Sequence, residues 1–138
     1  MIPVCLGLIA LSSLFLVGQE TWPPELEKTY LFGMHGSGFE ENFLATTSDL
    51  EVIERVKAQL VLPVANRYLH INGKIAYGNE ENLDWGWHFV QNQWTLEEIS
   101  IEVCDGGPNY LQEHLDEWLG MLDQFCPWNS YVIKKMKN

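Results

Sequence analysis

The chain contains three cysteines, and two of them, Cys104 and Cys126, allow two different chemistries. A thiolate becomes a nucleophile when an imidazole activates it, and His88 or His114, with Asp105 to orient the ring, supplies the other groups. The same two cysteines bonded to each other form a structural disulfide, in which neither sulfur can attack a substrate. Which of the two chemistries applies depends on whether the protein is in an oxidising compartment, where thiols form disulfides.

The first residues are typical of a secretory signal peptide. Residues 1–19, MIPVCLGLIALSSLFLVGQ, contain no charged side chain, and an apolar run extends from Ile2 to Val17. This run is shorter than the roughly 20 apolar residues of a membrane-spanning helix, and small residues near its end suit cleavage. We therefore predict a signal peptide at residues 1–19 and a single secreted domain at residues 20–138. A buried N-terminal helix or an uncleaved anchor is the alternative.

Export favours a disulfide, because an oxidising compartment bridges thiols. Cys5 lies in the predicted leader, so Cys104 and Cys126 are expected to pair. Two unpaired buried cysteines are the alternative, since cysteine is often buried as a small apolar residue. A bridge would exclude the thiol nucleophile.

Other residue patterns match enzymes and metal sites poorly. Ser37 in HGSGF lacks the G-x-S-x-G spacing of a nucleophile elbow, and the four histidines are too scattered for a structural zinc. No motif supplies a nucleophile, a base and an electrophile together, so we expect no enzymatic activity, no metal and no cofactor. The oxygen-rich residues 79–84, NEENLD, lack EF-hand spacing, which leaves weak calcium binding as an alternative.

Net charge restricts the class of partner. The chain has 8 basic and 19 acidic side chains, a net charge of −11, and all of them follow the predicted leader. Such an acidic domain repels phosphate backbones and anionic lipid surfaces, so we expect neither nucleic acid nor, after leader cleavage, membrane as a partner. Calmodulin targets are basic amphipathic helices. The helix expected at residues 109–122 has no Lys or Arg, so calmodulin binding is not predicted.

Hydrophobic periodicity predicts an α+β fold, with a mostly antiparallel sheet packed by two helices in one small domain. The expected strands are residues 29–34, 41–46, 85–91, 98–104 and 130–136, and the expected helices are residues 49–60 and 109–122. Ser48, followed three residues later by Glu51, predicts a capping box. Residues 68–77 alternate around Asn72-Gly73, which indicates either a tight hairpin or one strand with a glycine bulge.

A structural turn is expected between the strand at 98–104 and the second helix. It contains Asp105, Gly106, Gly107 and Pro108. The glycines would permit positive backbone φ, and Pro108 suits the position before a helix capped near Asn109. We therefore interpret the turn as structural.

Five motifs carry a resemblance to a known family. They are HINGKI (70–75), WGWHF (85–89), SIEVCDG (100–106), YLQEHLDE (110–117) and FCPWNS (125–130). This combination resembles the BP-seventy-four N-terminal domain family, a small domain at the N-terminus of a protist calmodulin-binding protein. The likeness extends over about residues 30–132 and implies a small α+β domain without an established enzymatic mechanism.

These observations favour a secreted, disulfide-stabilised, non-enzymatic domain that binds an extracellular protein, with protease inhibition as the most concrete version. The expected contact surface is the acidic, aromatic stretch from Asn79 to Trp87, with Asp84, Trp85 and Trp87 as contact residues. Carboxylates would steer a basic partner, and an indole would anchor it. If the strand already begins at Trp85, both tryptophans could be core residues. The alternative function is a secreted structural, carbohydrate-binding or venom-type component.

Overall fold

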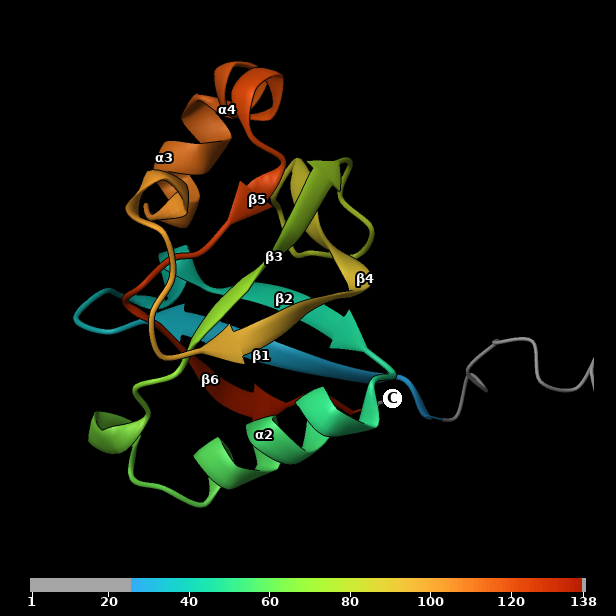
Figure 1. Ribbon diagram of the computed structural model, residues 1–138, viewed down its shortest axis with the longest axis vertical. Helices are drawn as coiled ribbons and strands as arrows, with labels where there is room; N and C mark the ends of the chain where they lie inside the picture. The colour runs from blue at the N-terminus through green and yellow to red at the C-terminus, as the bar shows by residue number, and fades with distance from the viewer. Residues whose placement is uncertain (1–25, 138) are drawn as a thin grey trace, which may run out of the picture.

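The computed structural model describes residues 26–137, which form two three-stranded antiparallel sheets with helices at both ends (Figure 1). The first sheet has the order β2-β1-β6, with β1 (Lys28–Met34), β2 (Phe43–Thr47) and β6 (Ser130–Lys135). The second has the order β4-β3-β5, with β3 (His70–Tyr77), β4 (Trp87–Glu97) and β5 (Gln124–Phe125). The predicted α+β class is confirmed, although the strands divide into two sheets. The predicted signal peptide and Cys5 lie outside the described residues.

The core lies between the two sheets and is largely aromatic. Alternate residues of β1 point inward, so that Tyr30 and Phe32 are buried. The ring of Phe32 stacks on Phe43 of β2 with a centroid distance of 5.4 Å and meets the edge of Trp94 of β4 at 5.7 Å. The indole N–H of Trp94 donates to the carbonyl of Thr46 at 2.8 Å, which joins the sheets with a hydrogen bond as well as by packing.

Helix α2 (Leu50–Leu60) covers the lower side of the first sheet in Figure 1 and buries Val52, Ile53 and Val56. Its N-cap is Asp49, whose carboxylate accepts from the backbone N–H groups of the following turn. The prediction of Ser48 as N-cap was therefore wrong by one residue. Ser48 is buried, and its backbone N–H donates to Asn92 Oδ1 at 2.6 Å, so Ser48 joins α2 to β4 instead.

Residues 70–77 form one continuous strand, so the predicted tight hairpin was wrong, and the bulge lies in β4 rather than at Gly73. The pairing of β3 with β4 shifts between Gly73, opposite Trp94, and Ile75, opposite Phe89. The extra residues belong to β4, where Asn92 has a φ of 65°. This bulge makes β4 longer than the strand predicted for residues 85–91.

Two predicted elements differ from the structure. Residues 98–104 are not a strand but an irregular segment ending in the 3-10 helix η4 (Glu102–Cys104), because pairing with β3 ends at Glu97. The second predicted helix is divided at His114, whose φ of −120° leaves helical geometry, into α3 (Pro108–Glu113) and α4 (Leu115–Met121). The N-cap of α3 is Gly107, not a residue near Asn109 as predicted. Short 3-10 turns, η2 (Phe39–Glu41) and η3 (Val64–Asn66), complete the elements.

Candidate functional site

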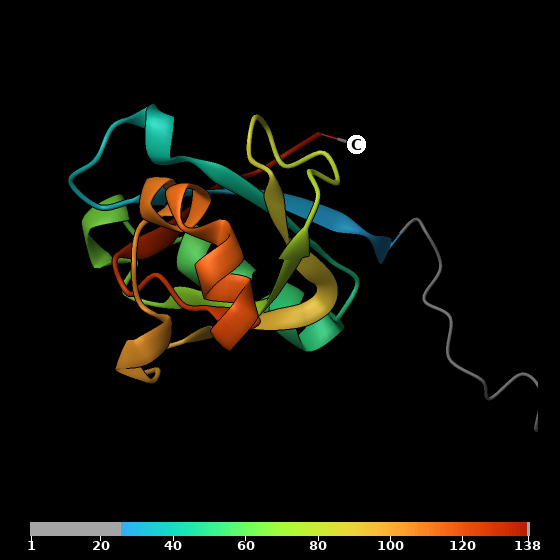
Figure 2. The same ribbon diagram turned by 90° about the horizontal axis from the view of Figure 1, so that it is seen from above.

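The loop between β3 and β4, residues 78–86, projects from one side of the domain (Figure 2). We call it the β3–β4 loop. Its backbone is left-handed at Gly78 and at three non-glycine residues, Glu80, Glu81 and Leu83, with φ values of 43°, 67° and 52°. Such conformations cost free energy and persist only where surrounding contacts hold them. The loop conformation is therefore fixed by its neighbours.

Two asparagine side chains hold the loop from inside. The amide of Asn79 donates to the carbonyl oxygens of Leu83 and Trp85, each at 2.7 Å. Asn82 is buried, accepts from the backbone N–H of Leu44 at 2.7 Å and donates to the carbonyl of Trp87 at 2.8 Å. Asn82 thus joins the loop to both sheets, because Leu44 belongs to β2 and Trp87 to β4.

Two further contacts fix the end of the loop. The backbone N–H of Gly86 donates to the side-chain oxygen of Gln112 in α3 at 2.7 Å. The indole N–H of Trp85 donates to the carbonyl of Asn42 at 2.7 Å. The base of the loop is therefore bonded to α3 and to the segment before β2.

The three predicted contact residues occupy different environments. Asp84 is exposed on the loop, and Trp85 is half-buried with its ring 5.6 Å from that of Trp87. Trp87 is fully buried among the core rings, including that of Phe125 at 5.4 Å, so it cannot touch a partner at the surface. Strand β4 begins at Trp87, which explains its inward direction. Sequence reasoning missed Leu83, which is 47% exposed on the loop.

A polar groove of about 330 Å³ lies beside the loop. Its lining includes Glu27, Glu80, Glu81 and His88, together with polar residues of β1 and β2. Within residues 26–137, no three His, Cys, Asp or Glu side chains are grouped so that they could hold a metal ion. A calcium site would use the side-chain oxygen of Asn82, which already accepts from the backbone N–H of Leu44.

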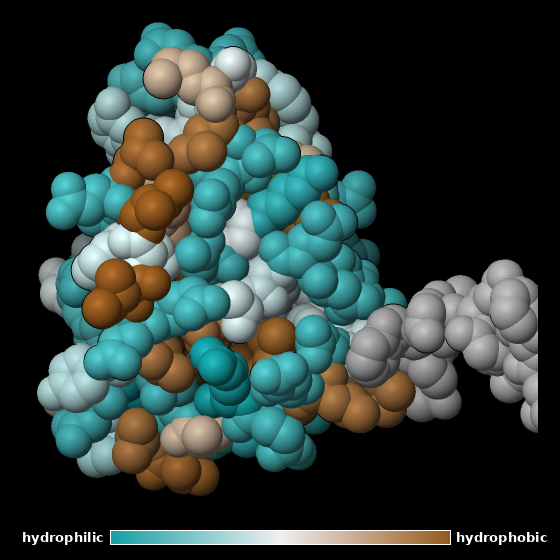
Figure 3. All heavy atoms as spheres, in the orientation of Figure 1, coloured by the Kyte–Doolittle hydropathy of each residue, from teal (hydrophilic) through white to brown (hydrophobic). Residues whose placement is uncertain are grey.

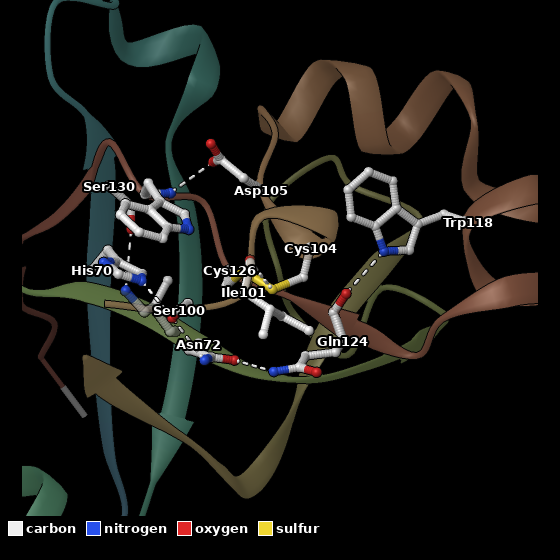
Figure 4. The surroundings of a disulfide bond; sticks show 12 residues. His70, Asn72, Ser100, Ile101, Cys104, Asp105, Trp118, Gln124, Cys126 and Ser130 are labelled. Carbon is white, nitrogen blue, oxygen red and sulfur yellow. Dashed lines mark hydrogen bonds between the residues drawn. A yellow bond between two sulfur atoms is a disulfide. The ribbon is translucent and has the colours of Figure 1, made fainter. Parts of the chain in front are cut away.

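The junction before α3 is held by a disulfide between Cys104 and Cys126 (Figure 4). The Cα atoms are 5.1 Å apart, and both residues are fully buried. The backbone N–H of Cys126 also donates to the carbonyl of Cys104 at 2.7 Å. This bridge confirms the predicted pairing and excludes a free thiol nucleophile in this arrangement. The chain returns to Cys104 because β5 pairs with β3 after α4.

The turn at residues 105–108 has a different basis from the one expected. Neither Gly106 nor Gly107 has a positive φ, so left-handed geometry does not explain the glycines. Gly106 instead lies against the ring of Trp118, and the buried Pro108 begins α3. Asp105 accepts from the backbone N–H of Trp128 at 2.9 Å, which gives the junction a second link.

A chain of buried and half-buried polar side chains beside the disulfide was missed by sequence reasoning (Figure 4). Ser100 Oγ lies 2.6 Å from His70 Nε2 and accepts from the amide of Asn72 at 2.8 Å. Gln124 of β5 then donates to Asn72 at 2.7 Å. Burial lowers the pKa of His70, while the carboxylates of Asp105 and Glu97 oppose that shift. The only signal in the sequence was the polar alternation in HINGK.

A hydrogen-bonded Ser–His pair is also half of a nucleophile arrangement. Here the imidazole is buried, and the ring of Trp128 stacks on it at 5.3 Å. Ser100 Oγ also accepts from the amide of Asn72. The bonds of Ser100 to His70 and Asn72 therefore hold the segment before η4 against β3. We interpret it as structural.

Comparison with known proteins identifies the family. The family model described as the BP-seventy-four N-terminal domain matches residues 28–138. Searches of curated proteins and of solved structures found no match. In the part of the chain that the structure describes, no helix is long and apolar enough to cross a membrane. Because the family model covers both sheets, the α-helices and the disulfide of the described residues, the chain belongs to the BP-seventy-four N-terminal domain family.

Proposed function

We propose that this chain is a secreted, disulfide-stabilised, non-enzymatic domain that binds an extracellular protein through the β3–β4 loop. The observation that carries the proposal is the way the loop is held. Asn79 and Gln112 bond to its backbone, and Asn82 bonds the loop to β2 and β4. Leu83 and the carboxylates of Glu80, Glu81 and Asp84 remain exposed. A loop that is already ordered loses little conformational entropy on docking, and more of the contact energy then appears as affinity.

The side chains that the loop presents favour a basic partner surface. Leu83 provides an apolar contact between acidic neighbours, and the domain as a whole carries a net charge of −11. Carboxylates at the edge of an interface accelerate encounter with a positive surface and make the association rate depend on salt. An apolar side chain at the centre then supplies contact area that excludes water.

Protease inhibition is the most concrete form of this function. A rigid projecting loop can block the mouth of a cleft without being reordered. Glu80, Glu81 and Leu83 are left-handed, whereas peptides that add a strand to a partner are extended. The loop would therefore obstruct a cleft rather than lie in it as a substrate does. A protease with basic residues around its active site is the matching target class.

The carbohydrate-binding alternative would use exposed tryptophans as stacking platforms. Trp87 and Trp94 are buried, and Trp85 and Trp118 are half-buried with their indole N–H groups bonded to carbonyls. Trp128 is 37% exposed, but one face stacks on His70. The tryptophans of the described residues therefore support core packing better than sugar stacking.

The test is an affinity capture with matched variants. Residues 20–138 are expressed through an oxidising pathway, immobilised and exposed to extracellular fluid, and captured proteins are identified by mass spectrometry. Leu83→Ala and Asp84→Asn change the loop, and Glu54→Gln on α2 removes an exposed charge elsewhere. Near-UV circular dichroism checks that each variant is folded.

We expect the two loop variants to reduce the affinity for the captured protein by about tenfold or more, with Glu54→Gln unchanged. A panel of secreted proteases, assayed in parallel, tests the inhibitor form directly. Loop variants that capture as well as the unmodified chain would place the interface elsewhere. Retention on polysaccharide, without any protein partner, would favour the carbohydrate-binding alternative.

A further inference from the structure

Apolar side chains gather on a second surface, formed by α3, α4 and the segment that joins β4 to α3. Five of them, Ile99, Ile101, Val103, Tyr110 and Met121, are between 55% and 86% exposed. Figure 3 shows apolar side chains along the edge formed by the segment that joins β4 to α3. Single exposed apolar residues are ordinary, whereas a group of them marks an interaction surface.

A small groove lies in this surface, and we call it the α3–α4 groove. Its volume is about 160 Å³, and it is lined by Val103, Tyr110, His114, Glu117, Trp118, Met121 and Leu122. Tyr110 stacks on His114 at a centroid distance of 4.1 Å, and the indole N–H of Trp118 bonds to the carbonyl of Gln124. The walls are therefore held in place by contacts within the domain.

The apolar segment beside the groove is also fixed. Ser100 bonds to His70 and Asn72, and Cys104 is bridged to Cys126. Although Ser100 and Cys104 are held by these bonds, the neighbouring side chains remain exposed; they are Ile99, Ile101 and Val103. Their exposure belongs to the ordered fold of the domain.

The charges around the groove select the kind of partner. Glu117 lines it, and the exposed Glu102 directly precedes Val103, which also lines it. The sequence has no Lys or Arg between Lys74 and Lys134. Lys74 lies 3.9 Å from the carboxylate of Asp123. An apolar groove with an acidic rim complements a segment that is apolar on one side and basic on the other.

A second copy of the chain fits this surface poorly. Two identical grooves would bring the same glutamates together, and each copy carries a net charge of −11. Like charges placed opposite each other across an interface repel and weaken the association. The charge pattern therefore favours a partner of opposite sign over self-association.

We propose that the α3–α4 groove binds a basic amphipathic helix of a partner protein. One large apolar side chain of the helix fills the groove against Val103, Tyr110 and Met121. Lysine or arginine side chains on its flanks pair with Glu102 and Glu117. This surface is separate from the β3–β4 loop, so either interaction can fail without the other.

The probe is a synthetic leucine–lysine peptide of about 14 residues with helical spacing of its leucines. A peptide of the same composition with scrambled spacing controls for charge alone. Met121→Glu places a carboxylate in the groove. Val61→Glu is the matched control, because Val61 is also exposed (83%) and lies just after α2, and the substitution adds the same charge. Binding is measured by isothermal titration calorimetry on the disulfide-bonded chain, with folding checked by near-UV circular dichroism.

We expect the amphipathic peptide to bind the unmodified chain, Met121→Glu to weaken binding by at least about tenfold, and Val61→Glu to leave it within about threefold. Equal effects of the two variants, equal binding of the scrambled peptide, or no binding at all would overturn the proposal. So would a concentration-dependent dimer that Met121→Glu abolishes, because the groove would then be a self-interface.

Discussion

Gly73 offers a sharp test of how closely β3 and β4 approach at the bulge. A Cβ atom added at Gly73 would lie 2.3 Å from Trp94 Cβ, 2.6 Å from Trp94 Cα and 2.6 Å from the carbonyl oxygen of Gln93. Favourable contacts between carbon atoms are about 3.5–4 Å, so β4 would have to move by about an ångström. Two of these atoms belong to the backbone and cannot rotate away.

Overpacking commonly costs about 1–3 kcal/mol, and a clash with backbone in a central strand belongs at the upper end of that range or above it. We expect Gly73→Ala to lower the free energy of unfolding by at least about 3 kcal/mol. With a urea m-value of about 1–3 kcal/mol/M, the midpoint would decrease by about 1–3 M. Urea denaturation followed by tryptophan fluorescence measures this shift.

Gly120→Ala in α4 is the matched control, because nothing beyond its chain neighbours and its own helix backbone lies within 4 Å of the added Cβ. Alanine is favoured over glycine in helices, so this variant should gain up to about 0.5–1 kcal/mol. The same chemical change is therefore expected to act with opposite sign at the two sites. An unchanged midpoint for Gly73→Ala would refute the close approach of the strands.

Replacing Cys104 and Cys126 with alanine removes a covalent link between residues 22 apart in the sequence. The loop-entropy relation predicts a loss of about 3 kcal/mol in unfolding free energy, and a measured loss below about 1 kcal/mol would contradict it. Asn82→Ala removes the partners of the Leu44 N–H and of the buried Trp87 carbonyl, so we expect a loss of about 1–3 kcal/mol in unfolding free energy and faster amide exchange in the β3–β4 loop. Unchanged exchange would show that other contacts hold the loop. Burial lowers the pKa of His70, so the unfolded chain takes up the proton first as the pH falls below about 6.5. The urea midpoint of the unmodified chain should therefore decrease on acidification more than the midpoint of His70→Gln does. Equal decreases in the two chains would exclude His70 as the cause.

The sequence predicted those helices and strands whose apolar spacing and end residues lie within the element itself or next to it. Strand β1, helix α2 and strand β6 formed close to the expected positions because apolar spacing and a stop signal such as Pro63 specify them locally. The pairing of Cys104 with Cys126 also followed from the sequence, because removal of Cys5 with the predicted leader would leave one possible pair.

Patterns that depend on a distant neighbour were decided by the tertiary structure. Ile99, Ile101 and Val103 alternate as a half-buried strand does, but β3 offers no pairing beyond His70, so they remain exposed. Trp87 was predicted to contact a partner and lies in the core, because β4 begins at that residue. Periodicity shows which side chains share a face, but it does not show whether another element covers that face.

For the β3–β4 loop and the α3–α4 groove, too, the sequence determined one part and the tertiary structure the other. The sequence by itself determined that the residues before Trp85 form an acidic stretch between two strands and that the domain carries a net charge of −11. Only the tertiary structure decided that Asn82 joins this stretch to Leu44, 38 residues away, and that Met121 and Val103 border one groove. Composition is a property of the chain, whereas the order of a loop and the continuity of a groove require contacts between residues far apart in sequence.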